Sequence, residues 1–358
     1  MVYRVCWCME RENKQYGSSR RRVLKHTGSA VAAASLIATA GCAGGNGGGS
    51  GPTNLRFNIP TNDKSIQGKI PGWLKENVEE RSGGDLTLEL FYNGELGGQV
   101  ESFENLSSGA IDMFITGYSI AGSQYGPAAM FDAPYLYDDY DHLLQSADPN
   151  HSEIAERVVS NMVEETNIRV IGTGIMGTRR LTLADEAVYH PDDLEGKQVR
   201  AVPDELMFET VNGLGAKAVN IDWSELPSAL STGSVSGQEN PYNIIWNSGI
   251  WESQNYLMET DHLDQTLPVY ISEHAWSELS SDQQDMMTEA MLETQETALE
   301  ELRSSLGDLK EQMGAELEIV GQDQLDMDAF RTSVRSRIRE KFPDSVDLIE
   351  EIRGSEYV

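Results

Sequence analysis

The feature that most constrains the fold is a regular alternation of strand-like and helix-like segments that begins at Leu55. Residues 55–59 and 86–91 have the apolar patterns of strands, and residues 72–81 between them have the periodicity of a helix. Further helices are expected at 98–108, 206–213 and 224–232, further strands at 111–116, 167–171, 196–202 and 218–221, and a polar loop at 237–241. This βαβ rhythm predicts a mostly parallel sheet that is covered by helices.

A long helix is expected near the end of the chain, over residues 281–313. Ser281 and Asp282 are typical N-terminal capping residues, and apolar residues recur after them at steps of three, four and seven. These residues are Met287, Met291, Ala298, Leu302, Leu306, Leu309 and Met313. At about 1.5 Å per residue the helix is roughly 45–50 Å long, enough to lie across two lobes. A coiled-coil dimer is the alternative, but Gly307 and Gly314 favour packing of the helix on its own domain.

The N-terminal segment has the composition of an export signal. Basic residues 20–22 precede an apolar run at 30–40, which is shorter than the roughly 20 residues that span a bilayer. The arginines that follow Ser19 resemble a twin-arginine signal, and the alternative is a basic tail on an ordinary N-terminus. We therefore expect residues 1–41 to be removed on export.

Cys42 is expected to carry a lipid. Thr39-Ala40-Gly41-Cys42 resembles a lipobox, although leucine is more usual at the position of Thr39. Six of the ten residues at 43–52 are glycine, which is typical of a flexible tether. The sequence predicts a lipidated cysteine and its tether at 42–53, and a protein held on the outer face of the cytoplasmic membrane.

Cysteine content and charge narrow the class of protein further. Loss of residues 1–41 removes Cys6 and Cys8, so no disulfide framework remains and the fold depends on its core. It also removes two of the 58 acids and seven of the 27 bases, which leaves a net charge of about −36. Nucleic acid and anionic lipid are therefore excluded as partners. The acids are spread along the chain, as on the solvated surfaces of halophile proteins, so an anion site would need local positive charge.

Two short motifs suggest enzymes, but their contexts argue against both. Residues 172–177 fit G-x-G-x-x-G, yet the stretch after them is strand-like and does not open the helix that a dinucleotide site needs. Residues 117–121 resemble a degenerate nucleophile elbow, which also requires an acid and a histidine placed by the fold. No H-E-x-x-H motif or cysteine cluster is present, so neither a metal nor a cofactor is expected.

An ordered set of motifs is more informative than either of these. It comprises Gly177-Thr178-Arg179-Arg180-Leu181-Thr182, Pro191-Asp192-Asp193-Leu194-Glu195-Gly196 with Arg200, Trp223-Ser224-Glu225, Ala229-Leu230-Ser231-Thr232-Gly233 and Gly237-Gln238-Glu239-Asn240-Pro241. Upstream lie Asn93-Gly94-Glu95-Leu96-Gly97-Gly98, Gly109-Ala110-Ile111-Asp112 and Phe131-Asp132-Ala133-Pro134-Tyr135. In order and spacing they resemble the extracytoplasmic solute-binding receptors of tripartite ATP-independent periplasmic (TRAP) transporters, the DctP family. The resemblance covers about residues 54–340.

The resemblance implies an α/β protein with the type II periplasmic-binding-protein fold. Two α/β lobes would surround a ligand cleft, with the long helix spanning both. Lobe I is expected to comprise 54–176 plus 266–305, and lobe II 177–265 plus 306–358. With the acidic charge, the resemblance indicates a halophilic archaeon as the source.

Two arginines are implied to bind the ligand. Arg200 matches the family arginine that holds an organic carboxylate as a bidentate fork, and a structural ion pair is its alternative role. Arg179 matches a second arginine of the same cleft, although the neighbouring Arg180 is the other candidate for the inward position. Either guanidinium would supply the local positive charge that an anion site in this acidic chain requires.

Four further residues complete the expected site. Asn240 matches an amide that hydrogen-bonds the ligand, and Trp223 matches an aromatic wall beside it. The alternative role of Asn240 is to cap the loop, and the alternative role of Trp223 is to pack in the core. Asn62 and Tyr118 fall near cleft positions of the first lobe.

The expected function is capture of a small organic carboxylate and its delivery to the membrane permease subunits of a TRAP transporter. Ser236, Pro227 and Ala201 depart from the family pattern, which leaves the rest of the ligand undefined. Two alternatives stay open: an exported lipid-anchored enzyme acting on a small acid, and a lipoprotein of purely structural role.

Overall fold

The computed structural model describes residues 52–358. The predicted export signal, Cys42 and nearly all of its tether lie outside the described residues. Among the helices of 52–358, none is long and apolar enough to cross a membrane.

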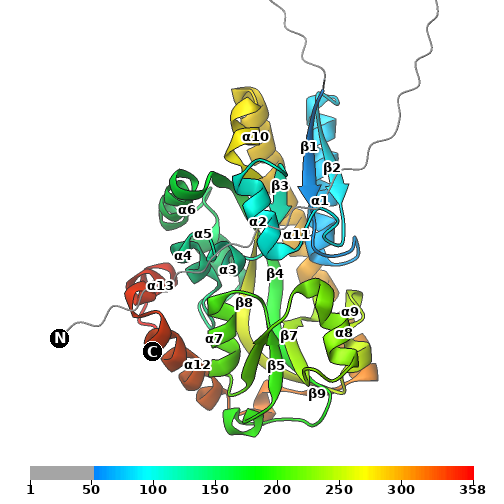
Figure 1. The fold of residues 1–358 in the computed structure, drawn as a ribbon, viewed down its shortest axis with the longest axis vertical. Helices are drawn as coiled ribbons and strands as arrows, with labels where there is room; N and C mark the ends of the chain where they lie inside the picture. The colour runs from blue at the N-terminus through cyan, green and yellow to red at the C-terminus, as the bar shows by residue number, and fades with distance from the viewer. Residues whose placement is uncertain (1–51) are drawn as a thin grey trace, which may run out of the picture. The chain divides into compact units, whose positions relative to one another are not determined.

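One mixed sheet organises the described part of the chain (Figure 1). Its strands are β1 (Thr53–Asn58), β2 (Leu86–Phe91), β3 (Met113–Ile115), β4 (Ile168–Leu183), β5 (Gln198–Ala201), β6 (Lys217–Asn220), β7 (Gly237–Pro241), β8 (Tyr256–Ser272) and β9 (Glu318–Val320). They follow the order β2-β1-β3-β8-β4-β7-β5-β6, with β9 beside β8. The first lobe is built around β1–β3 and the second around β5–β7, each with parallel strands.

The antiparallel pair β4 and β8 belongs to both lobes. These crossing strands have 16 and 17 residues, and their register runs from Ile168 opposite Ser272 to Leu183 opposite Tyr256. Three register shifts interrupt the pairing, after Val170, Ile175 and Arg179. A bulge bends and twists a strand locally, so within residues 52–358 the strands that connect the lobes in the sheet are bent.

Residues 172–177 lie inside β4, which excludes the dinucleotide loop. A side chain at Gly172 would meet Met291 Cγ at 2.7 Å, and one at Gly174 would meet Ile70 Cδ1 at 3.0 Å. These glycines therefore let two helices pack closely on the strand. The sequence prediction ended this strand at 171 because glycines weaken the strand pattern.

The helices are α1 (Ile66–Ser82), α2 (Gln99–Ser107), α3 (Tyr118–Ala121), α4 (Gly126–Ala129), α5 (Tyr140–Ala147), α6 (Glu153–Thr166), α7 (Glu205–Gly213), α8 (Leu226–Ser231), α9 (Tyr242–Asn247), α10 (Glu273–Glu278), α11 (Ser281–Glu316), α12 (Met327–Lys341) and α13 (Val346–Arg353). Helix α1 starts six residues before its predicted start, because Ser65 caps it and Pro71 is accommodated inside. The short 3-10 helix η1 covers Met130–Asp132.

The predicted long helix is α11, with 36 residues. Its N-cap is Ser280, one residue before the predicted cap, and Gln283 completes a capping box. The helix packs on α1 and β4 towards the first lobe and on α9 and β9 in the second (Figure 1). Most of the predicted apolar stripe is buried, while Leu306 and Leu309 are only partly buried.

Substitution of Gly307 tests whether the folded protein needs a glycine at this position of α11. Its side-chain position is open, with no atom within 4 Å. Replacing this helical glycine by alanine is expected to raise the free energy of unfolding by about 0.5–1 kcal/mol. Gly213→Ala is the contrasting variant, because its added Cβ would lie 2.9 Å from Val334 Cα and should destabilise the protein. Urea unfolding measures both changes. A Gly307→Ala protein that is less stable than wild type would mean that the folded state needs glycine there.

Candidate functional site

A small cavity lies where the two lobes meet the crossing strands. Its polar lining comprises Gln67, Gln99 and Thr116 from the first lobe, Arg200, Trp223 and Asn240 from the second, and Arg179 and Gln265 from the crossing strands. The volume of the cavity that the centre of a water molecule can occupy is about 20 Å³, so the cavity holds about one water molecule. A larger ligand must therefore enter with a rearrangement of the lobes or the side chains.

Arg200 is a buried guanidinium without a carboxylate partner. It extends from β5, is 1% exposed, and its Nε donates a hydrogen bond to Ile221 O at 2.9 Å. Within residues 52–358 its Nη2 has no hydrogen-bond partner, and no acid forms a salt bridge with it. Burial lowers the pKa of Arg200 to about 10, because the charged form is poorly solvated. A buried donor of this kind is costly unless something accepts its hydrogen bond.

Arg179 is in the opposite situation, since each of its three side-chain nitrogens donates a hydrogen bond within the protein. Its Nη2 donates to Glu239 Oε1 at 2.7 Å and to Glu239 O at 2.6 Å, and its Nε pairs with Oε2. Its Nη1 donates to Gln265 Oε1. Arg179 therefore lines the cavity as a fixed positive charge, held by two neighbours.

Glu239 joins this arginine to a buried histidine. Its carboxylate lies 3.1 Å from His262 Nε2, and His262 Nδ1 lies 2.8 Å from Thr260 Oγ1. Burial alone would raise the pKa of Glu239, but the charge of Arg179 and the hydrogen bond of His262 lower it to about 2. The carboxylate thus stays ionised and ties β7 to both crossing strands.

The structure separates the two neighbouring arginines of β4. Successive side chains of a strand point to opposite faces, and Arg179 is the one that lines the cavity. Arg180 lies on the other face, where its Nε is 2.7 Å from Asp261 Oδ1 and its guanidinium is 4.2 Å from the centre of the Tyr242 ring.

Asn240 and Trp223 both line the cavity. Asn240 belongs to β7, and its Nδ2 donates to Gln238 Oε1 at 2.5 Å. Trp223 is partly buried on the 3-10 helix η3 (Trp223–Glu225) and contacts apolar clusters of both lobes. The prediction of a loop at 237–241 was wrong, because this polar segment is a fully buried strand. Its side chains find partners inside the protein, such as Thr182 Oγ1 for Gln238 Nε2 at 2.8 Å.

The structure does not bring Tyr118 and Asn62 into this cavity. The hydroxyl of Tyr118 lies 3.1 Å from Thr173 Oγ1 and donates to Ala147 O at 3.2 Å, so its ring points into the core. Asn62 Nδ2 donates to Asn247 O at 3.1 Å, which joins the first lobe to α9. Gln265 and Thr116 line the cavity but were not predicted, and Gln265 lies on β8, a strand that the sequence analysis did not identify.

The serine of the possible nucleophile elbow lacks the partners of a catalytic group. Ser119 Oγ is buried, and within 52–358 it has no hydrogen-bond partner, so no base contacts it. Its backbone N–H donates to Asp132 Oδ2 at 2.7 Å. In the same part of the chain, no group of three or more histidine, cysteine or acidic residues is arranged to hold a metal ion.

Asp204 is a buried acid close to this site. One oxygen, Oδ1, caps α7 by accepting a hydrogen bond from Met207 N at 2.8 Å. The other, Oδ2, is buried and has no hydrogen-bond partner within the described residues. Burial raises the pKa of Asp204 to about 7.

Residues 57–343 match the sequence model of DctP, described as bacterial extracellular solute-binding protein, family 7. A solute-binding protein of Roseobacter denitrificans is 30% identical over 222 residues, which span 62% of this chain and 66% of that protein, just under two thirds of its length. The sialic acid-binding periplasmic protein SiaP of Vibrio cholerae is 27% identical over 239 residues, or 67% of this chain and 73% of that protein.

Solved structures agree with the fold described above. The TRAP periplasmic solute-binding protein of Roseobacter denitrificans with bound L-galactonate superposes with a TM-score of 0.76 at 25% identity, covering 84% of this chain and 99% of that chain. The corresponding protein of Sulfurospirillum deleyianum with bound succinate has a TM-score of 0.77 at 21% identity, covering 86% and 100%. The predicted periplasmic-binding-protein fold with its long helix is confirmed.

The raised pKa of Asp204 predicts how the free energy of unfolding depends on pH. An acid whose pKa is about 7 when folded and 3.8 unfolded destabilises the folded state increasingly between these pH values, and by a constant amount above pH 7. Asp204→Asn keeps an acceptor for the helix cap and removes this cost. The variant should be more stable than wild type at pH 8, by up to about 4 kcal/mol, and equally stable at pH 4.

Denaturant unfolding between pH 4 and pH 8 measures this difference. Asp326→Asn is the matched control, because Asp326 also caps a helix, α12, but is exposed. Parallel pH profiles for wild type and Asp204→Asn would show that Asp204 does not titrate in this range.

Proposed function

This chain belongs to the DctP family, family 7 of the bacterial extracellular solute-binding proteins, and we propose that it captures a small organic carboxylate between its lobes. Members of the family bind solutes outside the cytoplasm, so the protein is a binding protein rather than an enzyme. We further propose that the loaded receptor delivers the carboxylate to the membrane permease subunits of a TRAP-type transporter.

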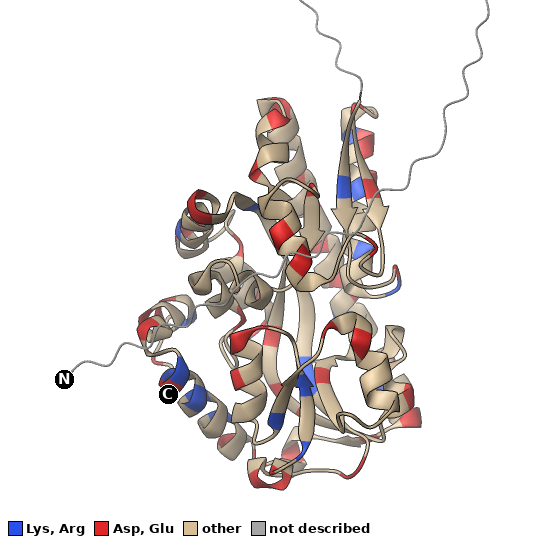
Figure 2. Ribbon diagram, in the orientation of Figure 1, with Lys and Arg blue, Asp and Glu red and all other residues tan. Residues whose placement is uncertain are grey.

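The observation that carries the proposal is the unpartnered Nη2 of Arg200. A carboxylate is the complementary group, since two parallel N–H donors match its two oxygens. The protein is strongly acidic and repels free anions: in the ribbon of Figure 2, red positions of Asp and Glu occur on most helices and blue positions of Lys and Arg are fewer. A buried cation at the cavity is therefore what allows such a surface to bind an acid.

The neighbouring residues have separate roles in this proposal. Arg179 adds positive potential but keeps its hydrogen bonds to Glu239 and Gln265, so it orients the site more than it grips the ligand. Asn240 and Trp223 supply an amide and an aromatic wall. L-galactonate, bound by the Roseobacter denitrificans protein, and sialic acid, bound by SiaP, are hydroxylated carboxylates, and the polar side chains of Gln265 and Thr116 would suit hydroxyl groups. We therefore favour a hydroxylated acid.

Binding requires the lobes to move apart and close again. The cavity has room for about one water molecule, whereas a sugar acid is far larger. The bent crossing strands β4 and β8 are the proposed hinge, since they join the lobes within the sheet. Neither Asn62 nor Tyr118 contacts the ligand in this proposal, because Asn62 bonds to α9 and Tyr118 faces the core.

Calorimetric titration tests the role of Arg200. The panel comprises L-galactonate, L-gulonate, D-erythronate, pantoate, succinate and sialic acid, in molar NaCl as suits a protein proposed to come from a halophilic archaeon. Arg200→Ala should weaken the affinity for the acid that wild type binds by at least about 100-fold, because a buried charge-assisted bond is lost. Arg157→Ala is the control, since Arg157 is an exposed arginine paired with Glu351. Unchanged affinity in Arg200→Ala would refute the carboxylate site.

The lipid on Cys42 is a separate proposal, and mass spectrometry of the mature N-terminus tests it. We expect a chain that begins at Cys42 and carries a lipid adduct, found in the membrane fraction. Cys42→Ser should move the protein to the soluble fraction without changing its ligand affinity. An unmodified Cys42, or cleavage elsewhere, would leave export intact but remove the membrane anchor.

A further inference from the structure

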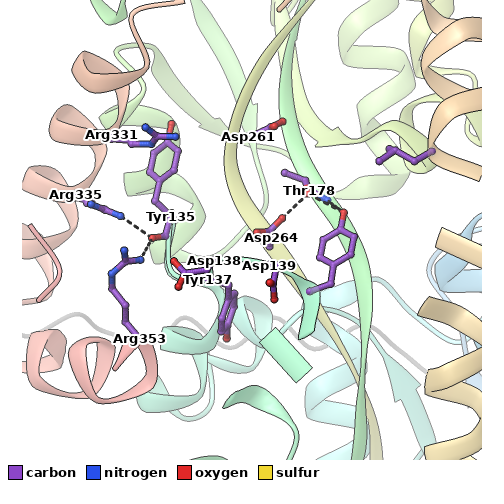
Figure 3. A pocket seen from close by; sticks show the side chains of 12 residues that line it. Tyr135, Tyr137, Asp138, Asp139, Thr178, Asp261, Asp264, Arg331, Arg335 and Arg353 are labelled. Carbon is purple, nitrogen blue, oxygen red and sulfur yellow. Dashed lines mark hydrogen bonds between the residues drawn. The ribbon is translucent and has the colours of Figure 1, made fainter. Parts of the chain in front are cut away.

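A second, larger cavity of about 640 Å³ lies behind the crossing strands. Thr178 and Asp264 line it, whereas their sequence neighbours Arg179 and Gln265 line the first cavity. Because adjacent residues of a strand face opposite sides, the two cavities lie back to back across β4 and β8. The second one is closed on its far side by α12 and α13, and Figure 3 shows its side chains.

One wall of this cavity is positive. Arg331 and Arg335 come from α12 and Arg353 from α13, on one side of Figure 3. Arg335 Nη2 and Arg353 Nη1 donate to Tyr135 O at 3.0 and 2.7 Å, and Arg335 Nη1 donates to Val358 O at 2.5 Å. Among the described residues, no aspartate or glutamate forms a salt bridge with Arg335 or Arg353. The nearest acid to Arg331 is Asp328, at 3.9 Å. Among residues 52–358, no aspartate or glutamate oxygen therefore lies closer than 3.9 Å to the side-chain nitrogens of these three arginines.

Two side-chain nitrogens of the positive wall have no hydrogen-bond partner among the described residues. The Nε atoms of Arg335 and Arg353 are buried and have no partner within residues 52–358. Burial, and then the neighbouring charge of Arg353, lower the pKa of Arg335. An anionic group in the cavity would stabilise this positive charge electrostatically, without contact to the two buried Nε atoms.

The opposite wall is negative. Asp138 and Asp139 lie on the segment that precedes α5, and Asp261 and Asp264 lie on β8. Asp264 accepts a hydrogen bond from Thr178 Oγ1 at 2.5 Å, but no basic side chain of the described residues forms a salt bridge with it. Asp261, in contrast, is already paired with Arg180. Burial raises the pKa of Asp264, as expected for a carboxyl group without a cation beside it.

We propose that this second cavity binds a small zwitterion, with its carboxylate towards Arg331, Arg335 and Arg353 and its ammonium group towards Asp139 and Asp264. The aspartates would repel a simple anion, and the arginines would repel a simple cation. A molecule that carries both charges therefore fits the cavity better than either. Three tyrosines, Tyr135, Tyr137 and Tyr140, also line the cavity. Aromatic faces favour ammonium groups.

The cavity spans parts that move relative to one another in the proposed hinge motion. Its positive wall includes α12, which packs on α7 of the second lobe, whereas α13 contacts α5 and η1 of the first. Tyr135 and Asp261 have φ angles of 52° and 40°, a backbone conformation that non-glycine residues rarely adopt. Both residues line the cavity.

Calorimetry with glycine betaine, acetate and tetramethylammonium tests the proposal at constant ionic strength. Glycine betaine should bind the full-length protein at least tenfold more tightly than either of the single-charge compounds. Equal or weaker binding than acetate would overturn the proposal.

Two variants locate the binding. Arg331→Gln removes an exposed cation, and Asp139→Asn removes a negative charge but keeps the acceptor that caps α5 through His142 N. Each should weaken glycine betaine binding at least fivefold, while Arg81→Gln, which alters an arginine in the first lobe paired with Glu289 and Glu293, should not. Arg200→Ala should bind glycine betaine as wild type does. Loss of binding in Arg200→Ala, or full binding in Arg331→Gln and Asp139→Asn, would assign the probe to another place and refute this site.

Discussion

The fully buried ion pair between Arg179 and Glu239 is the interaction on which the rest of the site depends. It joins β4 to β7, and His262 extends it to β8, so the strands that carry the cavity are fixed relative to one another. Burying two charges is costly, and the attraction between them roughly offsets that cost only when their geometry is good and other hydrogen bonds are satisfied. Here the main-chain oxygen of Glu239 and the side chain of Gln265 complete the arginine's partners. Removal of either charge would leave the other unpaired inside the protein.

Arg200 differs from Arg179 in one physical respect, and that difference separates structure from binding. Both guanidiniums are almost completely buried in the same cavity. One has a carboxylate within the chain, whereas the other has only the main-chain oxygen of Ile221. A compensated charge stabilises the fold, while an uncompensated one stabilises a complex, because only the second gains a partner when a ligand arrives. Arg179 and Arg200 therefore line the same cavity with different roles: Arg179 stabilises the fold, and Arg200 is the proposed ligand-binding residue.

Sequence reasoning succeeded where a local pattern determines the structure. The stripe of α11 and the alternation of β2 depend on short-range periodicity, and the motif around Arg200 placed that residue in the cavity. It failed for β7, whose polar residues look like a loop until the buried partners of Gln238 and Glu239 are known. It also failed for β8, which pairs with β4 across some 80 residues of sequence at its bulged centre, as Gln265 does with Gly177. The orientation of the Tyr118 side chain could not be predicted either, because its hydroxyl contacts Thr173, which lies 55 residues further along the chain.

The alternation of side chains along β4 and β8 also constrains how a receptor of this kind can change during evolution. Insertion of one residue before Arg179 in β4 would turn Arg179 away from the first cavity and Arg180 towards it, and would reverse the face of every later side chain of the strand. Insertions and deletions should therefore be tolerated in the surface loops but not in the crossing strands. New ligand preferences would then arise by substitution within a constant strand length, one face of the strand at a time.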